Sequence, residues 1–200
     1  MIDSIAALRG LYGEPKGRSV MKQIDHLDVH CRKFIAMSPF LVIASGDSKG
    51  HLDASPRGGE PGFVRVASDK SLLIPDSPGN NRLDTLTNII DTGSIGLLFM
   101  IPGVDETLRV NGQARLSNTE TSLQQFVGNK RIPKLVIEVT VVDAYLHCAK
   151  AFMRSKLWEQ ESLVDRSLLP TMGEMLADQT GTVIAPETQE AMKARYASDL

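Results

Sequence analysis

Short apolar runs separated by turn residues fill the chain between residues 40 and 145, and this pattern constrains the fold most. In the last run, every second residue from Leu135 to Val141 is apolar, as expected for the buried face of a strand. One helix, from about Leu83 to Asp91, interrupts six or seven strands, whereas parallel strands need a crossover between each pair. The pattern predicts a mainly β fold with flanking helices (α+β), an antiparallel barrel. The predicted strands cover residues 40–45, 51–55, 63–67, 71–75, 94–101, 107–117 and 134–145.

Helical patterns flank the strands on both sides. Residues 1–20 predict a short helix and a glycine-rich loop. Apolar residues then recur at helical spacing from Ile24 to Ile35. We expect Asp25 to cap this helix and Ser38-Pro39 to end it.

The chain turns helical again after residue 148. Thr171 to Glu174 has the form of a capping box, and the last helix is expected from Glu187 to Ala197. We expect one domain over residues 1–200. Its helical segments, 1–37 and 148–200, are expected to pack on the barrel or on a partner subunit, a choice the sequence leaves open.

Composition narrows the class of protein. A net charge of −2 over 200 residues gives no overall field that would attract nucleic acid or an anionic membrane. Cys31 and Cys148 form no CxxC pair and are expected to be reduced packing residues. The N-terminus lacks a signal-peptide pattern, and no apolar run approaches the roughly 20 residues of a membrane span. We expect a cytoplasmic protein without a nucleic-acid or membrane partner.

The first candidate site is the end of a predicted strand, Asp53 to Gly59. Small residues allow a planar ligand to approach the backbone closely, and an arginine has the fork geometry that suits phosphate oxygens. A plain surface turn explains the same residues equally simply. The candidate ligand contacts are Ala54, Ser55, Pro56 and Arg57.

The second candidate lies between an apolar strand and the predicted helix at Leu83. The unpaired amides and partial positive charge of a helix N-terminus favour phosphate, and Asn81 and Arg82 add donors. Simple capping by Asn81 is the alternative, although it gives the Arg82 guanidinium no role. Pro75 and Asp76 at the strand end complete this candidate.

Two further segments are weaker candidates for a binding site. Thr107 and Arg109 follow a Pro-Gly turn, and Arg109 alternates with apolar neighbours, so it faces either solvent or a pocket. A short run after the last strand carries three cations and the single tryptophan, which an amphipathic helix would equally explain. Its candidate substrate contacts are Lys150, Arg154, Lys156 and Trp158.

Several chemistries are disfavoured. His26 and His30 have the i, i+4 spacing of zinc ligands on the predicted helix, but no third ligand is near, so we expect no metal site. The Rossmann, P-loop and GxSxG motifs are absent. Aromatic residues make up only 5 % of the chain, which argues against a base-stacking surface for nucleic acid.

Taken in order, the motifs resemble the FMN-dependent branch of the pyridoxamine 5'-phosphate oxidase-like superfamily over roughly residues 20 to 160. The motifs are Ala54-Ser55-Pro56-Arg57-Gly58, Ile74-Pro75-Asp76, Gly79-Asn80-Asn81-Arg82, Gly96 to Gly103 and Leu108-Arg109-Val110-Asn111-Gly112.

The resemblance implies a six-stranded split barrel that is a homodimer with two FMN sites at the subunit interface. It implies flavin contacts at Ala54 to Arg57, a phosphate grip at Asn81 and Arg82, and an approach to the flavin by Thr107 to Arg109 from the same or the partner subunit. Asn81 stands where the family has a second cation, whose charge Arg57 could supply.

The expected activity is an FMN-dependent oxidoreductase acting on a small-molecule substrate. The oxidases' C-terminal motif, a tryptophan followed by an arginine–leucine–histidine run, is not reproduced by Ser155 to Trp158, so the substrate stays open. A non-catalytic flavin-binding or storage protein and a small-molecule-binding regulatory module of the same fold are the alternatives.

Overall fold

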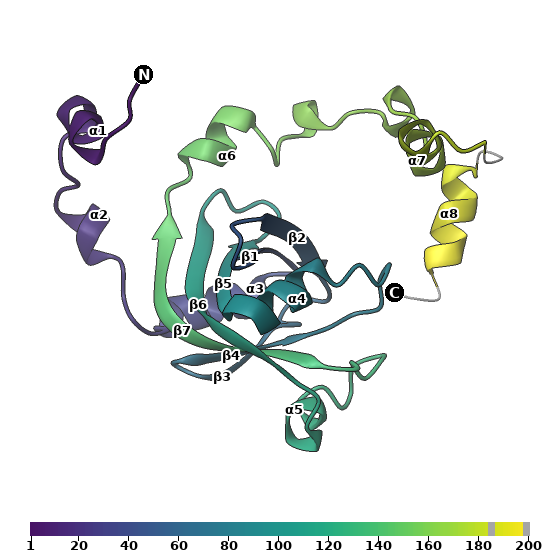
Figure 1. Ribbon diagram of the computed structural model, residues 1–200, viewed down its shortest axis with the longest axis horizontal. Helices are drawn as coiled ribbons and strands as arrows, with labels where there is room; N and C mark the ends of the chain where they lie inside the picture. The colour runs from purple at the N-terminus through teal and green to yellow at the C-terminus, as the bar shows by residue number, and fades with distance from the viewer. Residues whose placement is uncertain (184–186, 198–200) are drawn as a thin grey trace. The chain divides into compact units, whose positions relative to one another are not determined.

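A computed structural model describes residues 1–183 and 187–197 of the chain. It divides into two compact units, Met1–Trp158 and Glu159–Leu200. The first unit contains the strands (Figure 1), and the second contains only short helices among its described residues. The expectation of one domain over residues 1–200, with both terminal segments packed on the barrel or a partner, stays a prediction.

Within the described residues the strands form one seven-stranded sheet in which every pair is antiparallel. The predicted antiparallel fold with flanking helices is therefore confirmed, with the short strand β3 as the seventh strand. The order across the sheet is β2-β1-β5-β6-β7-β4-β3. The strands are β1 (Phe40–Gly46), β2 (Leu52–Gly58), β3 (Arg65–Ser68), β4 (Ser71–Pro75), β5 (Ser94–Met100), β6 (Thr107–Ser117) and β7 (Val136–His147).

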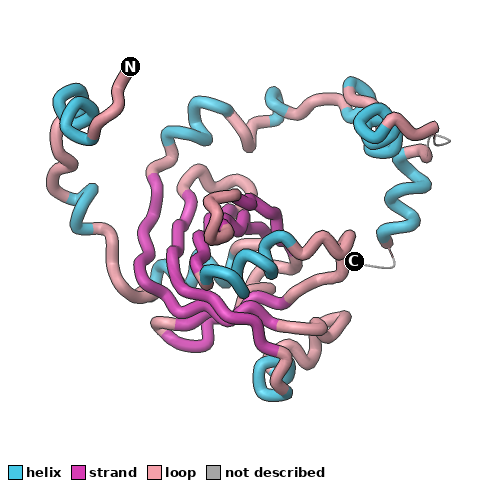
Figure 2. Tube along the Cα trace, viewed as in Figure 1, coloured by secondary structure: helices cyan, strands magenta, loops and turns pink. Residues whose placement is uncertain are grey.

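The sheet curves strongly on itself, as the tube in Figure 2 shows. The long strands β6 and β7 pair along their whole length, and their register shifts at Gly112. A side chain there would collide with the backbone oxygen of Thr140, so only glycine fits this close approach. A β-bulge bends the strands that it interrupts. On one side of this irregularity, the first half of β7 (Val136 to Thr140) also pairs with β4.

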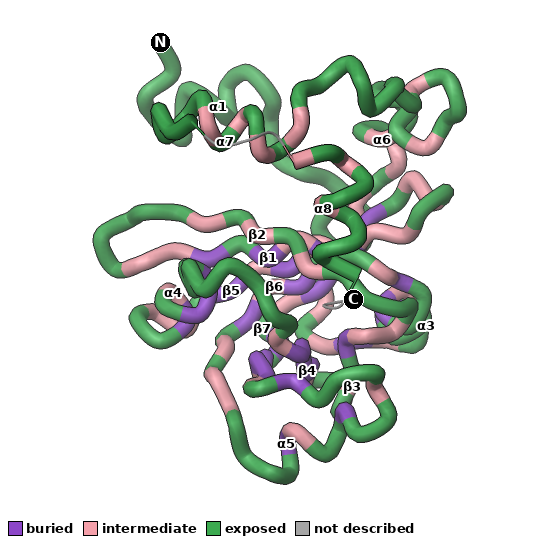
Figure 3. Tube along the Cα trace, turned by 90° about the vertical axis from the view of Figure 1, so that its right-hand side faces the viewer, coloured by how far each residue is buried: buried purple, intermediate pink, exposed green. Residues whose placement is uncertain are grey.

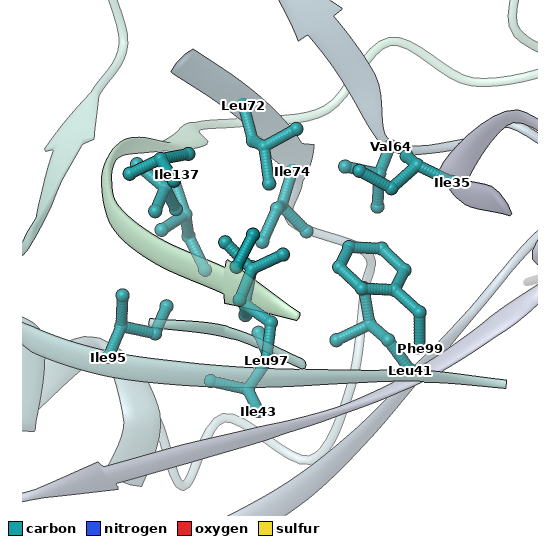
Figure 4. Packing of buried hydrophobic residues seen from close by; sticks show 14 of the residues in the cluster. Ile35, Leu41, Ile43, Val64, Leu72, Ile74, Ile95, Leu97, Phe99 and Ile137 are labelled. Carbon is teal, nitrogen blue, oxygen red and sulfur yellow. The ribbon is translucent and has the colours of Figure 1, made fainter. Parts of the chain in front are cut away.

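The core lies inside the curved sheet. Leu41 and Ile43 of β1 and Leu97 and Phe99 of β5 are directly paired and almost fully buried. Figure 4 shows these side chains pointing toward Ile74, Ile137 and others from the opposite strands. Each such side chain stabilises the fold by roughly 1.5–3 kcal/mol through burial. Burial is concentrated on the strands, as Figure 3 shows.

The helices of the first unit are mostly peripheral. The helix α4 packs on β1, β2 and β6, and α3 packs on β3 and β6. α1, α2 and α6 bury no residue, although Ile24 after α2 pairs with Ala144 of β7. The helices are α1 (Ile5–Tyr12), α2 (Arg18–Met21), α3 (Val29–Met37), α4 (Asp84–Thr92), α5 (Glu120–Gln124) and α6 (Lys150–Ser155).

The predicted cap at Asp25 is wrong. Helix α3 is capped by Asp28, whose carboxylate accepts from the Cys31 amide at 2.8 Å. Asp25 instead accepts from Lys70 Nζ at 2.7 Å, so its role is an ion pair with a distant turn. His26 consequently lies before the helix, and its predicted i, i+4 relation to His30 on one helix face does not form.

The two cysteines differ. Cys31 is buried in the core as expected, whereas Cys148 is exposed, so it is not a packing residue. No described helix is long and apolar enough to cross a membrane.

The second unit confirms the predicted capping box. Thr171 accepts from the Glu174 amide, and the Glu174 carboxylate accepts from the Thr171 amide at 2.7 Å. Its last helix is slightly shorter than predicted. The elements are η1 (Gln160–Ser162), η2 (Arg166–Leu168), α7 (Met172–Thr180) and α8 (Gln189–Tyr196). Residues 184–186 and 198–200 of the predicted segment 148–200 lie outside the described part of the chain.

Candidate functional site

The strand β2 divides the first predicted motif between two faces of the sheet. Ser55 and Arg57 pair with the buried residues Ile43 and Leu41 of β1 and therefore point to the inner face. Ala54 and Pro56 alternate with them, so they point to the outer face and are exposed. A single ligand can meet all four only through the backbone or the strand edge.

A polar network at the start of the same inner row was not predicted. Asp53 accepts from the Thr85 hydroxyl of α4 at 2.5 Å and from the Ser55 hydroxyl at 2.9 Å. Asn88 of α4 donates to Ser45 Oγ at 3.1 Å, and Ser45 lies 3.5 Å from the same carboxylate. These bonds attach α4 to the edge of the sheet. The alternation of Asp53 and Ser55 indicates a polar row, but the partners on α4, Thr85 and Asn88, are over 30 positions away from Asp53.

At the other end of this row Arg57 approaches Asp76, the residue after β4. Burial raises the pKa of Asp76, and the charges of Arg57 and Lys134 oppose that rise. Arg57 hydrogen-bonds only to the Pro56 carbonyl, at 2.9 Å, and forms no ion pair within the described residues. Since β2 is one edge strand and β4 lies next to the other, this approach spans the split in the barrel.

The predicted helix N-terminus differs in its cap. Helix α4 begins at Asp84, and its N-cap is Leu83 in the left-handed region (φ 60°) without a side-chain cap. Asn81 is also left-handed (φ 60°) and is not the N-cap, so the alternative of simple capping by Asn81 is wrong. Left-handed leucine is strained by roughly 1–3 kcal/mol and is seen mainly where surroundings or function demand it. The first amides of α4 thus have no side-chain acceptor from an N-cap residue.

Arg82 lies beside this helix end, where its Nε donates to Asp84 Oδ2 at 2.8 Å. The pKa of Arg82 is raised, first by this hydrogen bond and also by Asp53. The Arg82 side chain is 73 % exposed, so it remains accessible to a ligand. An incoming phosphate would have to share Arg82 with the Asp84 carboxylate, which already occupies the positive end of the helix.

The two arginines are not brought together by any described contact. Arg82 interacts electrostatically with Asp53, whereas Arg57 interacts with Asp76. Asp53 and Arg57 lie about 13 Å apart along an extended strand. The arrangement suits an elongated ligand better than a single phosphate held by both guanidiniums.

Thr107 and Arg109 lie on β6, three strands away from β2. Thr107 is buried, and Arg109 points to the outer face, where its Nη1 donates to the Tyr145 hydroxyl at 2.6 Å. Arg109 therefore points away from the face that carries Arg57.

In the segment after β7, Trp158 makes contacts with two other parts of the chain. Trp158 Nε1 donates to the Val104 carbonyl at 3.0 Å, and its ring stacks on Phe152 at 5.5 Å. These contacts fold the end of α6 back onto the turn between β5 and β6. Lys150, Arg154 and Lys156 are exposed.

The outer face also carries a shallow cavity of about 420 Å³. It lies where β1, β5 and β6 run side by side, and none of the predicted site residues lines it. Its lining includes Ala44, Ser45, Gly46, Leu52, Gly96 and Asn111.

Comparison with known families now identifies the chain. The family described as pyridoxamine 5'-phosphate oxidase matches residues 27–148, more than half of the chain. The chain belongs to the pyridoxamine 5'-phosphate oxidase family. The match begins just before α3 and ends at the first residue after β7, so it covers the whole sheet. It confirms the resemblance drawn from the order of the sequence motifs.

A solved structure with a TM-score above 0.5 shares the fold. A variant of HupZ from Group A Streptococcus is 20% identical, with 60% of this chain and 99% of that chain covered and a TM-score of 0.51. A Lactobacillus delbrueckii protein described as a pyridoxamine 5'-phosphate oxidase is 13% identical, with coverages of 61% and 99% and a TM-score of 0.47. At 20% identity the likeness to HupZ concerns the fold alone. A comparison with curated proteins gives no match.

Proposed function

We propose that this member of the pyridoxamine 5'-phosphate oxidase family binds FMN and is a flavin-dependent oxidoreductase. Family membership over residues 27–148 supports a flavin site in general. The observation that carries the proposal for this chain is the start of α4, where an uncapped helix end adjoins the exposed Arg82. Helix amides and a guanidinium are the donors that a flavin phosphate requires.

The residues around the split fit an elongated cofactor. Arg82, Asn81 and the first amides of α4 would hold the phosphate. Pro75 and Asp76 would lie along the ribityl chain. Bound FMN would supply the hydride or electron transfer, and the protein would position it.

The inner row of β2 would continue the same site. Ser55 offers a hydroxyl and Arg57 a guanidinium without an ion-pair partner in the described residues, while Ala54 and Pro56 would contribute backbone contacts. Because Thr107 and Arg109 lie on β6 and Arg109 faces outward, their approach to a flavin is proposed from the partner subunit. Lys150, Arg154, Lys156 and Trp158 are kept as proposed contacts of a small-molecule substrate.

A homodimer with flavin sites at its interface is part of the proposal. The outer face of the sheet supports it, because Phe40, Val42 and Leu98 lie there without complete burial in one chain. A second copy would remove this apolar surface from water.

The visible spectrum of the purified protein, recorded with and without added FMN, tests the proposal. We expect flavin absorption in the protein fraction, or binding of added FMN at micromolar concentration. Absence of both would refute flavin binding. Sedimentation at equilibrium would test the dimer separately.

The two alternatives give different results. A flavin-storage protein would bind FMN but show no flavin reduction by NAD(P)H and no reoxidation by oxygen in steady-state assays. A regulatory module of the same fold would retain another ligand, which native mass spectrometry would detect.

A further inference from the structure

A cationic cluster lies on the outer face of β6 and β7, around the ring of Tyr145. Arg109 Nη1 donates to the Tyr145 hydroxyl at 2.6 Å, and the guanidinium carbon is 5.4 Å from the ring centroid. Lys22 Nζ lies 5.2 Å from the same centroid and donates to the Leu146 carbonyl at 2.7 Å. The His147 ring is 5.0 Å from the Tyr145 ring. Two permanent positive charges and an imidazole therefore lie around the same aromatic ring, that of Tyr145.

The fold holds this cluster in place. Lys22 follows α2, and the chain two residues later pairs with β7 through Ile24 N to Ala144 O at 3.0 Å and its reciprocal bond at 2.8 Å. Arg109 and Tyr145 are direct partners in the β6–β7 ladder. The cations thus come from two strands and an N-terminal segment that are mutually hydrogen-bonded.

Neither cation of the cluster is neutralised. Across residues 1–183 and 187–197, Arg109 and Lys22 form no ion pair, whereas Arg82, Arg115 and Lys70 each have a carboxylate within 2.8 Å. The nearest acidic neighbour along β7, Asp143, accepts instead from Asn111 at 3.0 Å. Burial lowers the pKa of His147, and Arg109 and Lys22 lower it further, so the positive field reaches the imidazole.

We infer that Arg109, Lys22 and His147 form a second anion-binding site, which takes a carboxylate or phosphate group of a small molecule. An anion between two cations relieves their mutual repulsion and gains charge-assisted hydrogen bonds from both. A guanidinium and a neutral imidazole N–H provide directional donors for such oxygens.

This site is separate from the proposed flavin-phosphate site. Arg82 adjoins α4 near β2, and β6 is the third strand along from β2. Arg57 points to the inner face and Arg109 to the outer. Since FMN has one phosphate, an anion at Arg109 would belong to another molecule. Its assignment to the substrate rests on the proposed function, but anion binding itself does not.

Inorganic phosphate and acetate are the probes, titrated separately into isotope-labelled protein at pH 7 and constant ionic strength. The NMR signals of the His147 ring and the Tyr145 amide report binding locally. We expect saturable shifts with at least one probe, and the stronger probe identifies the chemical class. Shifts that grow linearly without saturation, for both probes, would mean screening alone and would overturn the site.

Arg109→Gln should weaken binding about tenfold or more, because a charge-assisted hydrogen bond contributes roughly 1.5–3 kcal/mol. Arg115→Gln is the matched control, since Arg115 is an exposed arginine on the same strand that is paired with Glu138. It should change binding less than twofold. Equal binding by the Arg109 and Arg115 variants would overturn the assignment. If Arg109→Gln proves unfolded by circular dichroism, Lys22→Gln takes its place, and unchanged binding there has the same meaning.

Flavin affinity separates this proposal from the previous one. Lys22→Gln removes a cation of the cluster that has no place in the proposed flavin site, so it should leave FMN affinity within about twofold. Arg82→Ala should weaken FMN binding about tenfold. An equal loss of FMN in both variants would assign the cluster to the flavin phosphate and refute a second site. If the wild-type protein binds no FMN, the proposed function fails, but the phosphate and acetate titrations still decide the Arg109 site.

Discussion

Thr85 in the first turn of α4 donates its hydroxyl hydrogen to the carboxylate of Asp53 on β2, at 2.5 Å. Thr85 is buried, and the same carboxylate also accepts from Ser55. The bond joins the helix whose amino end is proposed to hold the flavin phosphate to the strand that carries Arg57. Asp53 therefore helps to set the position of the proposed phosphate site relative to β2, together with the bond from Asn88 to Ser45.

Asp53→Ala should lower the free energy of unfolding by roughly 1–3 kcal/mol, because it leaves the buried Thr85 hydroxyl without its acceptor. Urea unfolding followed by circular dichroism measures the change. Thr85→Val provides the matched comparison, and the double variant should lose less than the sum of the single losses. Strict additivity would show that the two side chains do not interact in solution.

Gly112→Ala should destabilise the fold by roughly 1–3 kcal/mol, since the added methyl group would collide with the Thr140 backbone oxygen at the irregular point of the β6–β7 ladder. Thermal and urea unfolding both report this. Gly58→Ala is the control, because its nearest neighbour would be the Pro39 oxygen at 3.5 Å, an ordinary contact. Similar losses in the two variants would contradict the argument from the close approach.

Arg82→Ala should weaken FMN binding about tenfold or more through the loss of a charge-assisted hydrogen bond to phosphate. Arg154→Ala, which removes an exposed arginine of α6, should have a smaller effect. Fluorescence quenching of FMN on titration with each variant gives the dissociation constants. Equal affinities would argue against the phosphate assignment.

Asp84→Asn should strengthen FMN binding roughly two- to fivefold, because removal of the carboxylate releases Arg82 and removes a negative charge from the helix end. The same fluorescence titration measures it. Asp91→Asn, near the opposite end of α4, is the control and should leave the affinity unchanged. An unchanged or weaker affinity for the Asp84 variant would show that the phosphate binds elsewhere.

The two cysteines should react differently with an aromatic disulfide reagent at pH 8. Burial, and secondarily Asp28, raises the pKa of Cys31 to about 11, so its reactive thiolate is scarce as well as inaccessible. Cys148 is exposed and should react quickly. We expect one rapid thiol per folded chain and none in Cys148→Ser. Rapid reaction of that variant would indicate that the core around Cys31 opens readily.

Sequence reasoning located most of the elements. The predicted strand 107–117 coincides with β6, the predicted strand 71–75 coincides with β4, and α4 was displaced by one residue. These segments are identifiable because alternation of apolar side chains is a local property of the chain. The capping box at Thr171 was found for the same reason, since both of its partners lie within one turn.

Errors arose where distant residues compete with local preference. Aspartate is a preferred residue type for a helix cap, but the carboxylate of Asp25 is paired with Lys70. The neighbouring Ile24 is hydrogen-bonded to Ala144. Asparagine is also a preferred residue type for a helix cap, but helix α4 begins after Asn81, and its N-cap is the left-handed Leu83. Local propensity is a weak preference that tertiary contacts override.

The sequence by itself determined the family, the antiparallel sheet and the residue types of a phosphate site, because motif order and side-chain alternation are written along the chain. Only the tertiary structure decided which of those residues share a face. It set Ser55 and Arg57 inward, attached α4 to Asp53, and brought Lys22 to Tyr145. These relationships depend on strand register and sheet curvature, which are set by pairing and packing between segments that are not neighbours along the chain.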